Sequence, residues 1–186
     1  MTRAIFPRVR VWKRLSPAVI LAVFATSCGS SSHTPSSSVP TKTVRGPGLT
    51  FSTPTAWRVL RAAGGVTAKS PDPGGALVSV VVSRLEKAYA PSAFAQAAKE
   101  LDGVADKLAA QLGGRVTQRR TSTVDGMRIR EYKLAIRNPQ LHDVDDTVGF
   151  VLSGTREVQL LCQAPAGSGD PDGACTLLFG TLRLSS

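Results

Sequence analysis

The sequence has none of the motifs on which common hydrolases and nucleotide-binding enzymes depend. It contains no Gly-x-Ser-x-Gly nucleophile elbow and no glycine-rich loop of the kind that cradles phosphates. Histidine occurs only as His33 and His142, so a catalytic triad would have to use His142. The apolar run from Ala18 to Ala25 is too short to cross a bilayer. We therefore predict no catalytic residue and no cofactor, and keep an undetected hydrolase only as a second alternative.

The N-terminal segment is typical of a bacterial lipoprotein signal peptide. Five cations and no anion precede the short apolar run, which ends in Ala25-Thr26-Ser27-Cys28. Ser27 supplies the small residue before the cut, and Cys28 supplies the thiol that receives the diacylglyceryl group. Ala25 stands where leucine is commonest, which leaves a plain secretory cut or an unremoved anchor as alternatives. We expect the mature chain to begin at lipidated Cys28 and to lie outside the cytoplasm, anchored to the cell membrane.

Much of the positive charge belongs to this signal. The full sequence has 23 Lys and Arg against 13 Asp and Glu, a formal net charge of +10. Removal of the five signal cations leaves 18 against 13, or +5. A surplus of this size favours an anionic membrane surface or an acidic envelope polymer as partner. An exported protein rarely meets nucleic acid, so no nucleic-acid partner is expected.

Composition divides the chain into three regions. Residues 1–27 are the predicted signal peptide, residues 28–48 are the lipidated cysteine and a Ser/Thr/Pro-rich tether, and residues 49–186 are one domain. The tether has almost nothing to bury, so we expect it to be disordered. The last region has the size of an ordinary domain with its own core.

Within residues 49–186 the hydrophobic pattern predicts strands, one long helix and then more strands. The run 76–84 carries valines on both faces and is predicted to be a strand buried on both sides. Residues 92–112 have apolar side chains at helical spacing with mixed charges between them. We expect this helix to pack on a sheet, with a membrane-surface helix as the alternative. The other strand signals before the helix cover residues 49–52, 57–60 and 66–70.

Two hairpins are predicted after the helix. The first turns at Asp125-Gly126, a pair that readily adopts the positive φ of tight hairpin turns, and the second turns at Gly154. The order of elements predicts an α+β fold with a mainly antiparallel sheet flanked by helices. The predicted segments are the strands 116–123, 127–136, 147–153 and 157–163, a short helix at 174–179 and a strand at 181–184.

Two cysteines remain once Cys28 carries lipid. Cys162 and Cys175 should pair in an oxidising compartment and would close a loop rich in proline and glycine. The alternative is two buried free thiols.

Candidate binding residues are few. Trp57, Tyr89 and Tyr132 each join an apolar body to a polar tip and could line a ligand site, with core anchoring as the alternative. The second group concentrates oxygen and nitrogen ligands that a hard cation could use, but its ordinary interpretation is a polar loop between two strands, so no metal is predicted. Its members are His142, Asp143, Asp145 and Asp146.

Several segments resemble the PsbP/Mog1-like superfamily. Residues 51–57, FSTPTAW, resemble the Phe-x-x-Pro-x-Gly-Trp opening of that family. Asp125-Gly126 with Arg128 and Tyr132 is similar to the stretch after its long helix, and the strand 158–162 followed by residues 175–184 is similar to its ending. Within the superfamily, the chain looks most like the actinobacterial Lpq-type lipoproteins. The resemblance implies an α/β/α sandwich that serves binding and assembly, with little enzymology.

Signal, tether and resemblance together predict a lipid-anchored extracytoplasmic binding or scaffolding lipoprotein of the bacterial cell envelope, which is not catalytic. Its partner is expected to be an envelope protein or lipid. The alternative is a carrier of a small amphiphile or lipid in a pocket between helix and sheet. A large cavity would favour the carrier, and a solid core with an exposed patch would favour the interaction module.

Overall fold

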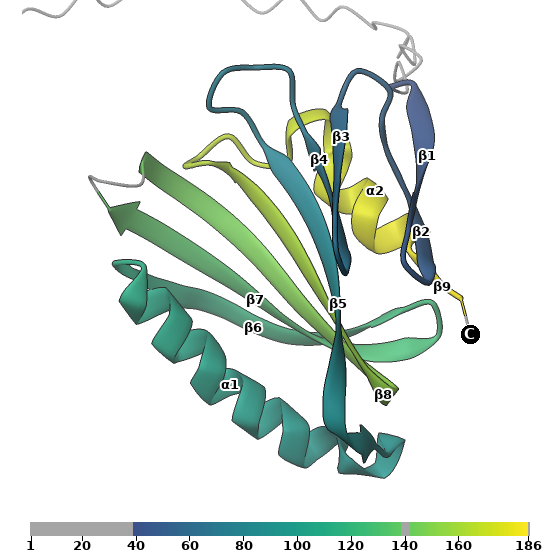
Figure 1. The fold of residues 1–186 in the computed structure, drawn as a ribbon. Helices are drawn as coiled ribbons and strands as arrows, with labels where there is room; N and C mark the ends of the chain where they lie inside the picture. The colour runs from purple at the N-terminus through teal and green to yellow at the C-terminus, as the bar shows by residue number, and fades with distance from the viewer. Residues whose placement is uncertain (1–38, 139–141, 186) are drawn as a thin grey trace, which may run out of the picture. The chain divides into compact units, whose positions relative to one another are not determined.

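The larger sheet of the described chain has six antiparallel strands in the order β3-β4-β5-β8-β7-β6. The computed structural model describes residues 39–138 and 142–185, so the predicted signal peptide and Cys28 lie outside the described residues. Residues 37–186 form one compact unit. Figure 1 shows the sheet with its helices. The strands are β3 (Arg58–Ala62), β4 (Gly65–Lys69), β5 (Leu77–Tyr89), β6 (Gly114–Val124), β7 (Met127–Asn138) and β8 (His142–Pro165).

Strand β8 doubles back on itself, as Figure 1 shows. Its first limb pairs with β7 and its second limb pairs with β5. Bonds between the limbs join the Ala166 N–H to the Asp143 carbonyl at 3.0 Å and the Gln163 amide to Asp146 at 3.1 Å. Gly154 has a φ of 56° between the limbs, a value that favours glycine. The predicted hairpin around Gly154 is therefore present within one continuous extended run.

Helix α1 (Phe94–Gln111) covers one face of the sheet, as its apolar spacing predicted. A short 3-10 turn, η1 (Pro91–Ala93), leads into it. Ala105 and Ala109 are buried against Tyr132, Leu134 and other side chains of β7 and β8. Tight packing of small residues on large ones is what brings a helix close to a sheet. The core prediction for this helix is confirmed.

The opposite face of the sheet packs on a second helix and a small sheet. Helix α2 (Ala174–Thr181) follows the turn η2 (Pro171–Gly173), and its Leu178 is fully buried. Ile129 of β7 lies in this core, whereas Tyr132 lies under α1, because odd and even strand residues point to opposite faces. The small antiparallel sheet has the order β1-β2-β9 and consists of β1 (Thr41–Gly46), β2 (Leu49–Pro54) and β9 (Arg183–Leu184).

The predicted fold class is confirmed: the chain is α+β, with antiparallel sheets flanked by two helices. Two local predictions were wrong. The tether was placed at 28–48, yet Thr41–Gly46 form β1 and Val44 is buried, because β2 supplies a hydrogen-bonding partner. Strand β5 is buried on one face only, since Val78 and Val80 are buried while Val81 is 43% exposed.

None of the helices in the described ranges is long and apolar enough to cross a membrane.

Candidate functional site

An open groove of about 690 Å³ lies on the α2 side of the six-stranded sheet, and we call it the sheet groove. Residues of β6, β7 and β8 form its floor and one side, and the segment from Gly169 to Phe179 forms the opposite wall. Trp57 and Ala76 also line it. Volumes of a few hundred cubic ångströms are typical of ligand sites.

The floor of the sheet groove is built from small side chains. Ala135 of β7 faces the same way as Thr147 and Ala164 of β8, and these residues leave room above the sheet. The groove ends at Phe179, whose ring lies over Gly149. A Cβ on Gly149 would come within 3.0 Å of that ring and 2.6 Å of the Ile129 Cδ1 atom, so only glycine fits there.

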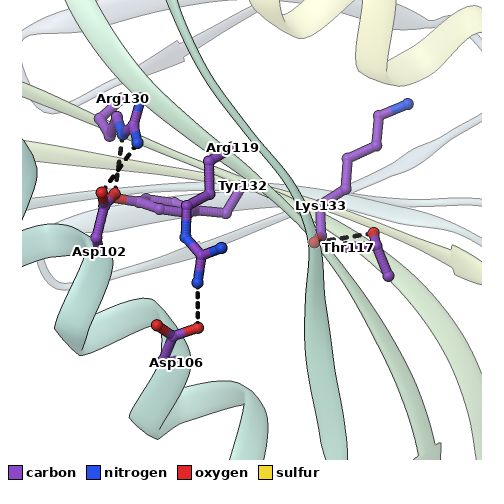
Figure 2. A network of polar contacts seen from close by, with 7 residues as sticks. All are labelled: Asp102, Asp106, Thr117, Arg119, Arg130, Tyr132 and Lys133. Atoms are coloured by element: carbon purple, nitrogen blue, oxygen red, sulfur yellow. Dashed lines mark hydrogen bonds and ion pairs between the residues drawn. The ribbon is translucent and has the colours of Figure 1, made fainter.

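Four exposed cations stand on the β6 and β7 side of the groove: Arg115, Arg120, Lys133 and Arg137. Arg120 is paired with Glu131, whose Oε2 lies 2.7 Å from its Nε, and Arg137 is paired with Asp145 at 2.7 Å. Within the described ranges, no carboxylate lies within 4.0 Å of the charged groups of Arg115 or Lys133. The side chain of Lys133 points away from α1, as Figure 2 shows. This side of the groove is therefore positively charged.

A disulfide between Cys162 and Cys175 ties the wall to the sheet, with 5.5 Å between the Cα atoms. The predicted pairing is confirmed. Asp170 caps α2 by accepting the Cys175 and Thr176 N–H groups at 2.7 and 2.9 Å. The Trp57 indole N–H donates to Asp172 at 2.8 Å. The wall is therefore held by covalent and polar links in addition to the burial of Ala174 and Leu178 in the core.

The three predicted ligand aromatics do not form one site. Trp57 is 1% exposed and lines the sheet groove from within the core, where it also anchors the wall. Tyr132 lies on the opposite face under α1, and its hydroxyl donates to Asp102 at 2.8 Å (Figure 2). Tyr89 lies at the far end of β5, opposite Gly154. Only Trp57 belongs to the groove.

The acidic segment does not form a metal site in the part of the chain that the structure describes, where no group of three metal-binding side chains converges. Asp145 accepts bonds from the Gly167 N–H at 2.9 Å and from Arg137, which together hold the pKa of Asp145 below its ordinary value. Asp146 points to the other face of β8 and is buried. The main chain of Asp143 accepts the Ala166 N–H, and the side chain of His142 lies outside the described residues.

Replacing Asp146 with asparagine is expected to stabilise the protein at pH 7, by on the order of 1 kcal/mol. Burial raises the pKa of Asp146 above its ordinary value of 3.8, and the bond from Gln163 only partly offsets this. When the pKa of a carboxyl group is higher in the folded than in the unfolded protein, the free energy of unfolding falls as the pH rises from the unfolded-state pKa to the folded-state pKa. The gain from Asp146→Asn should therefore be present at pH 7 and absent below about pH 3.5. Urea denaturation at the two pH values measures it.

Asp145→Asn is the matched control for this prediction. The pKa of Asp145 is lowered, so its bonds contribute stability at pH 7 that is lost as the pH falls through the folded pKa. The asparagine variant at 145 should therefore be less stable than the wild type at pH 7. If both substitutions shift the unfolding midpoint in the same direction, the prediction that burial of the Asp146 carboxylate costs stability at pH 7 is wrong.

Sequence reasoning missed the basic residues of the groove. Arg115 and Lys133 come from different strands, and neither stands in a recognisable motif. A signal was present in β7, where Lys133, Ala135 and Arg137 alternate on one face. Such an alternation of cations around a small residue marks an open, basic sheet face.

Comparison with solved structures identifies the fold. No protein-family model and no curated protein matches the sequence. The solution structure of cyanobacterial PsbP (CyanoP) from Synechocystis sp. PCC 6803 matches with a TM-score of 0.54 and 11% identity, over 86% of this chain and 98% of that one. The two proteins therefore share a fold. At 11% identity the likeness shows the fold alone.

Two further structures are similar to this chain. A crystal structure from Bacteroides thetaiotaomicron matches with a TM-score of 0.57 and 14% identity, over 78% of this chain and 48% of that one. The chain thus spans about half the length of the Bacteroides protein. A Pseudomonas aeruginosa protein of unknown function, described as a putative regulator, gives a TM-score of 0.43 at 18% identity, over 73% of this chain and 90% of that one.

Proposed function

We propose that the protein is a non-catalytic binding lipoprotein, anchored outside the cytoplasm by a lipid on Cys28, which holds its envelope partner in the sheet groove. The observation that carries this proposal is the basic side of the groove. Arg115 and Lys133 stand exposed beside a floor of small side chains, with no carboxylate beside either of them in the described ranges. Uncompensated charge next to open space is a feature of binding surfaces rather than of packing.

The carboxylates that line the groove support binding rather than acid–base chemistry. Asp145 is held by Arg137 and the Gly167 N–H, and both oxygens of Asp170 accept bonds from the start of α2. A general base must be free to reach a substrate proton. These groups instead hold the walls of the groove in place. The hydrolase alternative would depend on His142.

The signal sequence and the fold together support membership of the Lpq-type lipoproteins. Because β1 begins at Thr41, the domain starts earlier in the sequence than predicted, and twelve residues separate this strand from Cys28. A lipid on Cys28 would thus hold the PsbP-like domain close to the membrane surface, where anionic partners are concentrated.

A carrier of a small amphiphile is the second candidate, and one observation favours it. Opposite the cations, the wall of the groove includes apolar groups beside Asp170 and Thr176: the disulfide, Pro171, Ala174 and Phe179. A groove with one basic side and one apolar side matches a molecule with an anionic head and an apolar body.

Site-specific photocrosslinking in the native cells tests the groove. A photoreactive amino acid at Thr147, on the groove floor, is compared with one at Lys107, on the exposed side of α1. We expect a discrete adduct from position 147 and none from position 107, with mass spectrometry distinguishing a protein from a lipid. An adduct from 107 alone, or none from either position, would overturn the groove assignment.

The lipid anchor is tested separately, in cells fed a clickable fatty acid. The wild-type chain should carry the label and Cys28→Ala should not. Label retained by the alanine variant would exclude Cys28 as the anchor.

A further inference from the structure

The two uncompensated cations of the sheet groove are placed to act on one ligand. Arg115 of β6 lies opposite Ala135 of β7, and Lys133 is two residues from Ala135 along β7. Both side chains line the groove at diagonal positions on the same face, and a bulge in β6 between Val116 and Gln118 separates their rows. Both side chains are long and exposed, and the small side chain of Ala135 leaves the space between them open. One anion can therefore be reached by both.

Threonine hydroxyl groups lie near the space between Arg115 and Lys133. Thr147 of β8 lies directly opposite Lys133 on the same face and lines the groove. The hydroxyl of Thr117 donates to the Lys133 carbonyl at 3.1 Å, which fixes β6 against β7 just beside Arg115 (Figure 2). An arginine fork, an ammonium group and a threonine hydroxyl are the donors that bind phosphate oxygens in proteins.

The nearby carboxylates do not cancel this charge. Asp145 lies in the same row as Ala135, but Arg137 pairs with it. Glu131 pairs with Arg120. Asp146 lies on the other face of β8, and burial raises its pKa. Asp170 also lines the groove, on the opposite wall, where it is bonded to the start of α2. On the β6 and β7 side of the groove, Arg115 and Lys133 therefore have no carboxylate partner in the described ranges.

The apolar wall lies across the groove from these cations. It presents Phe179, Pro171 and the disulfide, and Ala164 lies on the floor below it. Head-group donors on one side and apolar surface on the other define the class of ligand. We infer that the sheet groove binds a phosphate-bearing amphiphile, with its phosphate on Arg115 and Lys133 and its apolar part along the α2 wall. This inference rests on the proposed function, which makes the groove the binding site.

The test uses the full-length lipoprotein in a non-ionic detergent, titrated with dihexanoyl phosphatidylglycerol and followed by phosphorus NMR and native mass spectrometry. The variant is Arg115→Gln/Lys133→Gln, and the matched control is Arg61→Gln/Lys107→Gln, which removes the same charge from exposed positions outside the groove. We expect the groove variant to bind at least about tenfold more weakly than the wild type, and the control to bind within twofold of it. Arg115→Lys/Lys133→Arg should restore most of the affinity.

Two further probes separate the sources of the phosphate. Inorganic phosphate should compete at the same site but more weakly, because it lacks the apolar part. Equal affinity for inorganic phosphate would overturn the role of the α2 wall. A neutral dihexanoyl glyceride that binds as tightly as the phospholipid would overturn the phosphate assignment.

Other outcomes bear on the proposed function. Equal losses in the groove variant and its control would show general charge attraction and overturn the site. If no phospholipid binds while the photocrosslinker at Thr147 still forms its adduct, the groove remains the binding site and only the ligand class fails. Thermal unfolding of each variant confirms that it is folded.

Discussion

A chain in which Cys162 and Cys175 are both alanine is expected to have a free energy of unfolding about 3 kcal/mol below that of the wild type. The bond joins residues 13 apart in the sequence, and in the chain-entropy account it restricts the unfolded chain by closing that loop. Loss of the bond also loosens the turn before α2, which is then tied to the rest of the domain by the hydrogen bond from Trp57 to Asp172 and by the burial of Ala174. Urea denaturation at pH 7 measures the stability change.

The control for this prediction separates the bond from the side chains. The wild-type chain after reduction and alkylation should lose a similar amount of stability, and native hydrogen exchange of residues 166–173 should accelerate in both forms. Two thiols that alkylate in the unreduced native protein would contradict the disulfide itself. A double variant as stable as the wild type would show that the loop is restrained by its hydrogen bonds alone.

The local elements could be predicted because their signals lie within short stretches of sequence. Asp125 and Gly126 both adopt positive φ, at 49° and 75°, as the residue pair predicted for the hairpin turn. The apolar spacing of α1 depends on neighbours three and four residues apart. The pairing of Cys162 with Cys175 could be predicted because residues 49–186 contain no other cysteine.

The remaining features depend on contacts between distant segments. β1 resembles linker in composition, and only its pairing with β2 makes it a strand with Val44 in the core. The exposure of Val81 follows from the face of β5 that remains uncovered. The groove needs Arg115, Lys133 and Thr147 to meet across three strands, and a one-residue change of register would move each to the other face. No short pattern carries that information.

A partly buried network around the Asp102 carboxylate joins helix α1 to the sheet, and loss of this network is the second large expected effect. Asp102 of α1 accepts two bonds from Arg130, at 2.9 and 3.0 Å, and one from the Tyr132 hydroxyl at 2.8 Å (Figure 2). Tyr132 is 1% exposed, so without Asp102 its hydroxyl would lose its hydrogen-bond acceptor at a place that water does not reach. Asp102→Ala is expected to lower the free energy of unfolding by about 2 kcal/mol at pH 7.

The pH dependence distinguishes the ionised network from simple packing. The bond from Arg130 is the main reason that the pKa of Asp102 is lowered, with the Tyr132 hydroxyl adding to it. Because this pKa is lower in the folded than in the unfolded protein, the network stabilises the protein fully above the unfolded-state pKa. That contribution is lost as the pH falls through the folded-state pKa. The difference between wild type and Asp102→Ala should therefore shrink on acidification below about pH 4.

A double-mutant cycle that combines Asp102→Ala with Tyr132→Phe measures how much of the stability depends on the bond between these two residues. Removing only the hydroxyl leaves the Arg130 pair in place and should cost about 1 kcal/mol. Because both substitutions remove the same bond, their effects should add to more than the loss in the double variant. Arg119→Gln, which removes the neighbouring exposed pair with Asp106, is the matched control and should cost less than Asp102→Ala, since exposed ion pairs contribute little. Strict additivity of the two network substitutions would show that Asp102 and Tyr132 act independently, and that α1 is held by the packing of Ala105 and Ala109 instead.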